Sequence, residues 1–255
     1  MAVSWKGSIS FGLIYIPIQL IMATREQQIP FNQLHKKCQE RIQYKKICSY
    51  CGEEVKSDEI IKGYEYEKGE YVIFTDEDFE RLKSEKDKTI QIEQFVQLEE
   101  IDPVYYEKAY YVEPTGGEKA FFLLLKAMEE TNKVGLAKVV FGKKEHLVAL
   151  RIDKGTMYLY KLYFHNEIIP YKGYDFRFTL EGPEVELAKQ LIQNLTRPFD
   201  PERFYDSYYE RLKDAIEHKI QGKSVPQVKD EPDTQIMNLM EALRQSIRSS
   251  EGPRA

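Results

Sequence analysis

The chain has 255 residues, 42% hydrophobic and 31% charged, which suits a globular protein with one large domain plus an appendage, or with two domains. A net charge of −5 and a pI near 5.6 argue, on the total alone, against a nucleic-acid ligand. The most apolar stretch, residues 9–23, is too short and too often interrupted by polar residues to span a membrane, so no membrane contact is expected.

Aromatic and β-branched residues predict strands in the first part of the chain. Residues 5–22 are one such run, punctuated by Gly7, Gly12 and Pro17. A short helix is predicted after Pro30, because Phe31, Leu34, Cys38 and Ile42 recur at helical spacing. The pattern then predicts a tight turn at 47–52, two strands within 60–74, an acidic helix at 76–86, and strands at 89–98 and 104–112.

A Pro-Thr-Gly-Gly breaker at 114–117 precedes a predicted helix over 118–131. Its apolar residues Phe121, Leu124, Leu125 and Met128 share one face. Three strands are predicted next, at 135–141, 146–152 and 157–164, separated by turns at Gly142 and Gly155. We therefore expect a mixed but mainly β fold, with a barrel or a large antiparallel sheet at its centre.

Helical spacing replaces strand patterns after Gly182. One helix is predicted from Pro183, and a second from Asp200-Pro201, a capping residue followed by a proline that suits the first turn. A last helix is predicted from Thr234. The resulting division is a β core over 1–181 that holds an insertion at about 31–55, a helical arm over 182–220, a linker over 221–233, and a terminal helix and tail over 234–255.

All three cysteines lie close to one histidine, in the order His35, Cys38, Cys48 and Cys51. An odd cysteine count does not suggest a disulfide framework and favours a cytoplasmic protein. Four soft ligands in two closely spaced pairs are typical of structural zinc, and on a helix His35 and Cys38 share a face. Four protein ligands leave no open position, so the zinc site is expected to be structural. The alternative is a metal-free set of small thiols.

Charge is unevenly distributed along the chain. Residues 31–46 hold five basic residues and one acidic residue, and residues 133–177 hold nine and four. Residues 53–108, in contrast, hold eight basic and eighteen acidic residues. A fold that turns the basic segments to one surface would be polarised and could attract an anion, although such blocks are also common on solvated faces without a partner.

Signatures of catalysis are absent from the sequence, and we expect no enzyme. Gly222-Lys223-Ser224 resembles the end of a phosphate-binding loop, but Glu217 stands where that motif requires glycine. There is no dinucleotide-binding, nucleophile-elbow or zinc-protease motif.

The order of several motifs resembles the prokaryotic Ku family over nearly the whole chain. These motifs are WKGSISFGL at 5–13, Ile16-Pro17, LHKKC at 34–38, Arg41-Ile42, YKK at 44–46, 48–55, 60–66, EHLVALR at 145–151, FDPE at 199–202 and LMEAL at 239–243. The resemblance implies a β-barrel core, a bridge that closes a ring with the second subunit of a homodimer, and a helical arm that embraces that subunit.

The resemblance also implies function: sequence-independent binding of double-stranded DNA ends, and recruitment of an ATP-dependent DNA ligase in non-homologous end joining, in the nucleoid-associated cytoplasm. DNA-contact candidates are Lys36, Lys37, Arg41, Lys45, Lys46, Lys138, Lys143, Lys144 and Arg151. Candidates for the dimer arm are Tyr205, Tyr208, Leu212 and Ile216, and those for ligase docking are Met237, Met240 and Leu243. Each apolar set could instead pack onto its own chain.

Two other functions stay open at this point. Lys6 is a candidate for a Schiff-base lyase acting on abasic sites near DNA ends, which the resemblance suggests. The chain could also be a zinc-stabilised protein-interaction module that does not bind nucleic acid.

Overall fold

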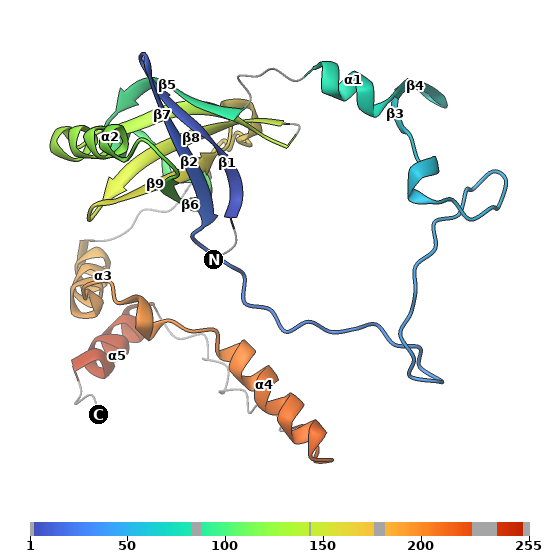
Figure 1. Cartoon of the computed structure of the whole chain (residues 1–255). Coiled ribbons are helices and arrows are strands. Elements are labelled where there is room, and N and C mark those ends of the chain that lie inside the picture. Colours follow the sequence, from blue (N-terminus) through green and yellow to red (C-terminus); the bar gives the residue numbers. More distant parts are fainter. Residues whose placement is uncertain (1–2, 83–87, 143, 176–181, 226–238, 252–255) are drawn as a thin grey trace. The chain divides into compact units, whose positions relative to one another are not determined.

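The computed structural model describes residues 3–82, 88–142, 144–175, 182–225 and 239–251. The chain divides into two compact units, Met1–Tyr171 and Lys172–Ala255. Figure 1 shows strands concentrated in the first unit and helices in the second. Among the described residues, no helix is long and apolar enough to cross a membrane.

A closed seven-stranded barrel dominates the first unit, in the order β1-β2-β6-β9-β8-β7-β5. Its strands are β1 (Val3–Phe11), β2 (Ile14–Met22), β5 (Thr89–Val96), β6 (Tyr106–Pro114), β7 (Val134–Phe141), β8 (Lys144–Asp153) and β9 (Thr156–Leu162). Neighbouring strands pair antiparallel except β1 and β5, which pair parallel through Ser8 and Thr89 and close the barrel. The mainly β fold is therefore confirmed, and the sheet closes on itself.

Alternating residues fill the barrel. On β7, Ala137 and Val139 belong to the buried core, and on β8, Val148 and Leu150 do, so the residues between them face outward. Helix α2 (Glu118–Thr131) contacts β2 and β8 and contributes Phe121, Leu124, Leu125 and Met128 to the same core. A second, smaller cluster of Val134, Ala149 and Leu162 packs with residues from the short helices η3 (Leu98–Glu100) and η4 (Pro103–Tyr105).

The helix predicted over 31–42 is wrong. Leu34 and Arg41 instead form an antiparallel bridge around a turn. Phe31, Leu34 and Ile42 are 68%, 51% and 47% exposed, so no core stabilises the apolar face that a short helix would need. The predicted turn at 47–52 is present, and so are the two strands after it, β3 (Lys62–Glu67) and β4 (Glu70–Phe74). Helix η1 (Ser57–Glu59) precedes this hairpin, and helix α1 (Asp76–Arg81) follows it.

The second unit contains the helices α3 (Gly182–Leu195), α4 (Ser207–Ile220) and α5 (Leu239–Glu251). The predicted start of the second helix at Asp200 is wrong. Asp200 caps only a short 3-10 turn, η6 (Pro201–Arg203), whereas the Asp206 carboxylate accepts the Tyr209 N–H and caps α4. Tyr205 therefore precedes the helix, and the second helix of the arm begins at Ser207, after a short 3-10 turn.

Candidate functional site

Two small turns carry the cysteines and the histidine. In the first, the His35 N–H donates to the Glu40 carbonyl at 2.9 Å, and the Gln39 N–H donates to the His35 carbonyl at 2.8 Å. Gln39 takes a left-handed φ of 58° to close this turn. The turn brings His35 Nδ1 within 3.0 Å of Cys38 Sγ, so the pair is adjacent for a reason other than the predicted helix.

The second turn repeats this construction. Ile47 bridges Glu54, and the Gly52 N–H donates to the Cys48 carbonyl at 2.9 Å. Gly52 has a φ of 74°, a conformation that favours glycine. Hydrogen bonds from the backbone N–H groups of Cys51 and then Tyr50, followed by one from the Cys51 side chain, lower the pKa of the Cys48 thiol. Cys48 and Cys51 thus form a second adjacent pair of soft donors.

The two pairs do not meet in a single cluster. Among the described residues, no three His, Cys, Asp or Glu side chains come together in a way that could hold a metal ion. Each turn holds two soft donors, half the number that a tetrahedral site requires, and Cys38 and Cys51 are exposed. The residues therefore suit zinc in type and spacing, while the two halves stand apart.

Exposed basic side chains lie in the first turn and in the residues that follow it. Lys36 and Lys37 lie in the turn between His35 and Cys38, and Arg41, Lys45 and Lys46 follow it, all exposed. Lys45 pairs with Glu54 at 2.6 Å. Within the described part of the chain, Lys36, Lys37, Arg41 and Lys46 have no carboxylate partner. These four charges are free to meet an anionic ligand.

The basic candidates on the barrel are differently placed. Lys138 pairs with Glu93 at 3.2 Å, Lys144 with Glu167 at 2.5 Å, and Arg151 with Asp153 at 3.9 Å. Lys143 lies outside the described residues. Any phosphate that binds here must compete with a carboxylate already in place, a feature that charge counting could not reveal. Lys6, the lyase candidate, is exposed on β1.

An exposed aromatic pair marks the arm. Phe199 and Phe204 are 82% and 75% exposed, yet their rings stack with centroids 6.2 Å apart. Together with Arg197 and Arg203 they line an open hollow of about 480 Å³. The sequence did not indicate this hollow, because the pattern at residues 200–204 predicted a helix. The signal that could have indicated it is the presence of Arg197 and Arg203 close to the two phenylalanines in the sequence.

The predicted arm residues divide into two groups. Tyr205 and Tyr208 are 76% and 65% exposed, whereas Leu212 and Ile216 are half-buried. Together with Phe199 and Phe204, the two tyrosines make four large aromatic side chains within ten residues that are exposed to solvent. Exposed aromatic side chains of this kind are enriched in protein interfaces.

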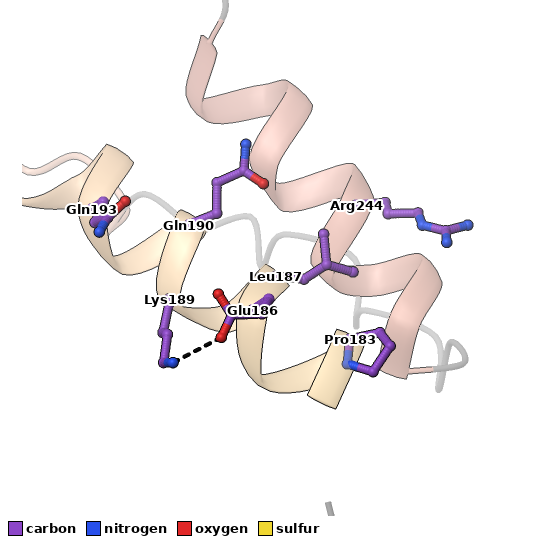
Figure 2. A pocket seen from close by; sticks show the side chains of 7 residues that line it. All are labelled: Pro183, Glu186, Leu187, Lys189, Gln190, Gln193 and Arg244. Atoms are coloured by element: carbon purple, nitrogen blue, oxygen red, sulfur yellow. Dashed lines mark hydrogen bonds and ion pairs between the residues drawn. The ribbon is translucent and has the colours of Figure 1, made fainter. Parts of the chain in front are cut away.

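The predicted docking helix is packed within its own unit. Helix α5 contacts α3, Ile247 is 7% exposed and Leu243 is half-buried. Figure 2 shows the hollow beside this contact, with Arg244 from α5 at its edge. Met237 lies outside the described residues, and so does the side chain of Met240.

Comparisons with known proteins agree along the whole chain. Residues 10–191 match the family described as the Ku70/Ku80 beta-barrel domain. A "Non-homologous end joining protein Ku" of Lachnoclostridium phytofermentans is 41% identical over 98% of this chain and 97% of its own length. One of Archaeoglobus fulgidus is 42% identical over 98% of this chain and 99% of its own length. Another, of Symbiobacterium thermophilum, is 45% identical over 98% of this chain, which spans 64% of that relative.

Proposed function

Because this chain belongs to the Ku family, we propose that it binds the ends of double-stranded DNA and acts in non-homologous end joining. The single observation that carries this proposal is the similarity to end-joining proteins over both units, which confirms the resemblance in the sequence motifs. Its role is that of a binding protein and scaffold, in the nucleoid-associated cytoplasm. An acidic total charge does not oppose this role, because phosphate contacts depend on local charge.

Binding takes place through the phosphate backbone and without base readout. Lys36, Lys37, Arg41 and Lys46 are the first candidates, because they are exposed and unpaired among the described residues. Lys45 and the barrel residues Lys138, Lys144 and Arg151 contribute less, since each already has a carboxylate partner. Contacts of this kind fix position on the duplex and weaken steeply with salt.

A homodimer supplies the second half of the ring. The exposed aromatic side chains of the arm support this assembly, because a lone chain leaves them in water. The side chains proposed to contact the second subunit are those of Tyr205, Tyr208, Phe199 and Phe204. Aromatic side chains and arginines at the centre of an interface usually carry most of its binding energy.

A structural zinc ion joins the two turns at His35, Cys38, Cys48 and Cys51. The closeness of the donors within each pair supports this assignment, and a bound ion supplies the link between the pairs. Metal content of the purified protein is the test. We expect about one zinc per chain, lost in both Cys38→Ser and Cys48→Ser. Wild-type protein without zinc, or zinc retained by both variants, would overturn the assignment.

Recruitment of the end-joining ligase is assigned to α5. Its apolar side, with Leu243 and Ile247, suits insertion into a partner's groove. The predicted linker before it, 221–233, lies outside the described residues from 226 onward. Loss of ligase stimulation with retained DNA binding, on removal of residues 234–255, is the expected sign of this role.

A gel-shift comparison tests the main proposal. A linear duplex and the same duplex closed into a circle are compared at low and moderate salt. Binding to the linear form alone, weakening with salt and increasing in steps with duplex length, is expected of a ring that threads onto an end. Equal binding to both forms would reject the ring, and binding to neither would favour a protein-interaction module.

A further inference from the structure

The contact between α3 and α5 uses one side of each helix. On α5, Ile247 is 7% exposed and Leu243 is half-buried. On α3, Leu187 is half-buried and lies on the side that faces α5, as Figure 2 shows. Ile192, on another side of α3, is 66% exposed. An apolar stripe on each helix is therefore covered by the other.

The covered side of α5 is the side assigned above to the ligase. Of the other α5 side chains that the structure describes, Ala242 is half-buried beside this stripe, and Arg244, Gln245, Ser246 and Arg248 are polar and exposed. A helix of 13 residues has room for one apolar stripe of this width. Leu243 and Ile247 cannot occupy a groove of another protein while they remain packed on α3.

The α3 side of the α3–α5 contact is only partly covered. None of the residues of α3 is fully buried, although several are partly covered. Two helices on their own leave their outer faces in water and exclude solvent only along the seam between them. The free energy that opposes separation of two helices scales with the apolar area between them, so a half-buried seam opposes it less than a fully buried core does.

We propose that α3 is a latch that holds α5 in the free protein, and that a partner must displace α3 to bind α5. This inference rests on the proposed docking of the ligase through α5. Only molecules in which α5 has separated from α3 can bind the partner, and these are a minor population. The latch therefore lowers the apparent affinity of the protein for the partner. Removing the latch raises that affinity without any new contact.

Charge indicates what kind of groove receives α5. Arg244 and Arg248 are exposed beside the apolar stripe, and Arg244 has no carboxylate partner among the described residues. Glu186, which lines the same hollow, is engaged by Lys189 at 2.8 Å. The fitting partner is therefore an apolar helix-binding groove with an acidic rim, on which the two arginines find carboxylates.

Hydrogen exchange of the full-length protein without a partner tests the latch directly. Leu187→Glu places a charge in the seam while leaving α5 unchanged, and Ile192→Glu is the matched control on an exposed side of the same helix. We expect faster exchange of the peptide covering 239–251 in Leu187→Glu, and exchange as in the wild type for Ile192→Glu. Unchanged exchange in Leu187→Glu would overturn the latch.

Ligase binding measured on the same proteins tests the competition. We expect Leu187→Glu to bind the ligase about three- to tenfold more tightly, Ile192→Glu to match the wild type, and Ile247→Glu to lose at least about tenfold. Weaker binding by Leu187→Glu would make α3 part of the docking surface and overturn the latch. If none of the proteins, wild type included, binds the ligase, the proposed docking through α5 fails, and the exchange result still decides whether α3 holds α5.

Discussion

Lys138 on β7 and Glu93 on β5 form an ion pair across two neighbouring strands of the barrel, with Nζ and Oε1 3.2 Å apart. Both side chains are about half exposed, at 42% and 51%. The outward position of Lys138 follows from the burial of Ala137 and Val139 on either side of it. A basic residue on the barrel is thus available to DNA only in competition with its own carboxylate.

Glu93→Gln is expected to strengthen binding to duplex ends. Loss of the carboxylate frees Lys138, and an exposed pair of this kind is worth up to about 1 kcal/mol, so the gain reaches at most about fivefold. Fluorescence anisotropy with a labelled duplex at low salt measures it. Glu99→Gln, which removes an equal charge from an exposed residue of η3, is the matched control. Equal gains in both variants would show that total charge matters and that the pairing does not.

Lys36→Ala combined with Lys37→Ala is expected to weaken DNA binding and flatten its salt dependence. Each contact between a lysine and a phosphate contributes about one unit to the slope of log affinity against log salt, so the double change removes about two. Lys45→Ala is the control, because Lys45 is paired with Glu54 at 2.6 Å and should change the slope less. A slope that stays constant in the double variant would place the DNA away from this turn.

Much of the barrel was predictable because its signals are local. Helix α2 has the predicted bounds, since a Gly-rich breaker precedes it and its apolar residues repeat at helical spacing. The closure of the sheet was not predictable in the same way. It depends on parallel pairing between Ser8 and Thr89, which lie 81 positions apart, and on a similarly distant pairing of β2 with β6.

The candidate sites show what spacing alone could not supply. Cys38 follows His35 by three residues, which suggested one helix face, but a turn closed by Gln39 brings the pair together. The basic character of its segment made Lys144 a candidate for DNA contact. The sequence did not show that Lys144 forms an ion pair with Glu167. Helical spacing predicted the apolar side of α5. It could not show whether a partner or α3 covers that side, because burial depends on the folded unit.

His146 is expected to make the barrel less stable as pH falls from 7 to 5. Burial, then the ammonium groups of Lys161 and Lys144, lowers the pKa of His146, while Glu107 and Glu167 act in the opposite direction. Below the ordinary histidine pKa of about 6.5, the unfolded chain therefore takes up a proton that the folded chain refuses, and stability falls until the folded pKa is reached. Thermal denaturation at several pH values measures this loss.

His146→Gln removes the titrating group and should reduce the fall in Tm over that range. His165→Gln, at an exposed position in the 3-10 turn η5 (His165–Glu167), serves as the control and should retain the wild-type fall. A pH dependence unchanged by His146→Gln would assign the acid sensitivity to other groups, such as the Lys144–Glu167 pair.

Two adjacent leucines of α2 provide the sharpest test of the core. Leu124 is 2% exposed and packs in the barrel cluster, whereas Leu123 is 59% exposed on another side of the helix. Leu124→Ala removes buried methyl groups and leaves a cavity, so it is expected to lower the free energy of unfolding by about 2–5 kcal/mol. Leu123→Ala involves the same chemical change in water and is expected to shift that free energy by about 0.5 kcal/mol or less. Urea denaturation followed by circular dichroism measures both, and equal losses would mean that α2 does not pack against the barrel through the face described above.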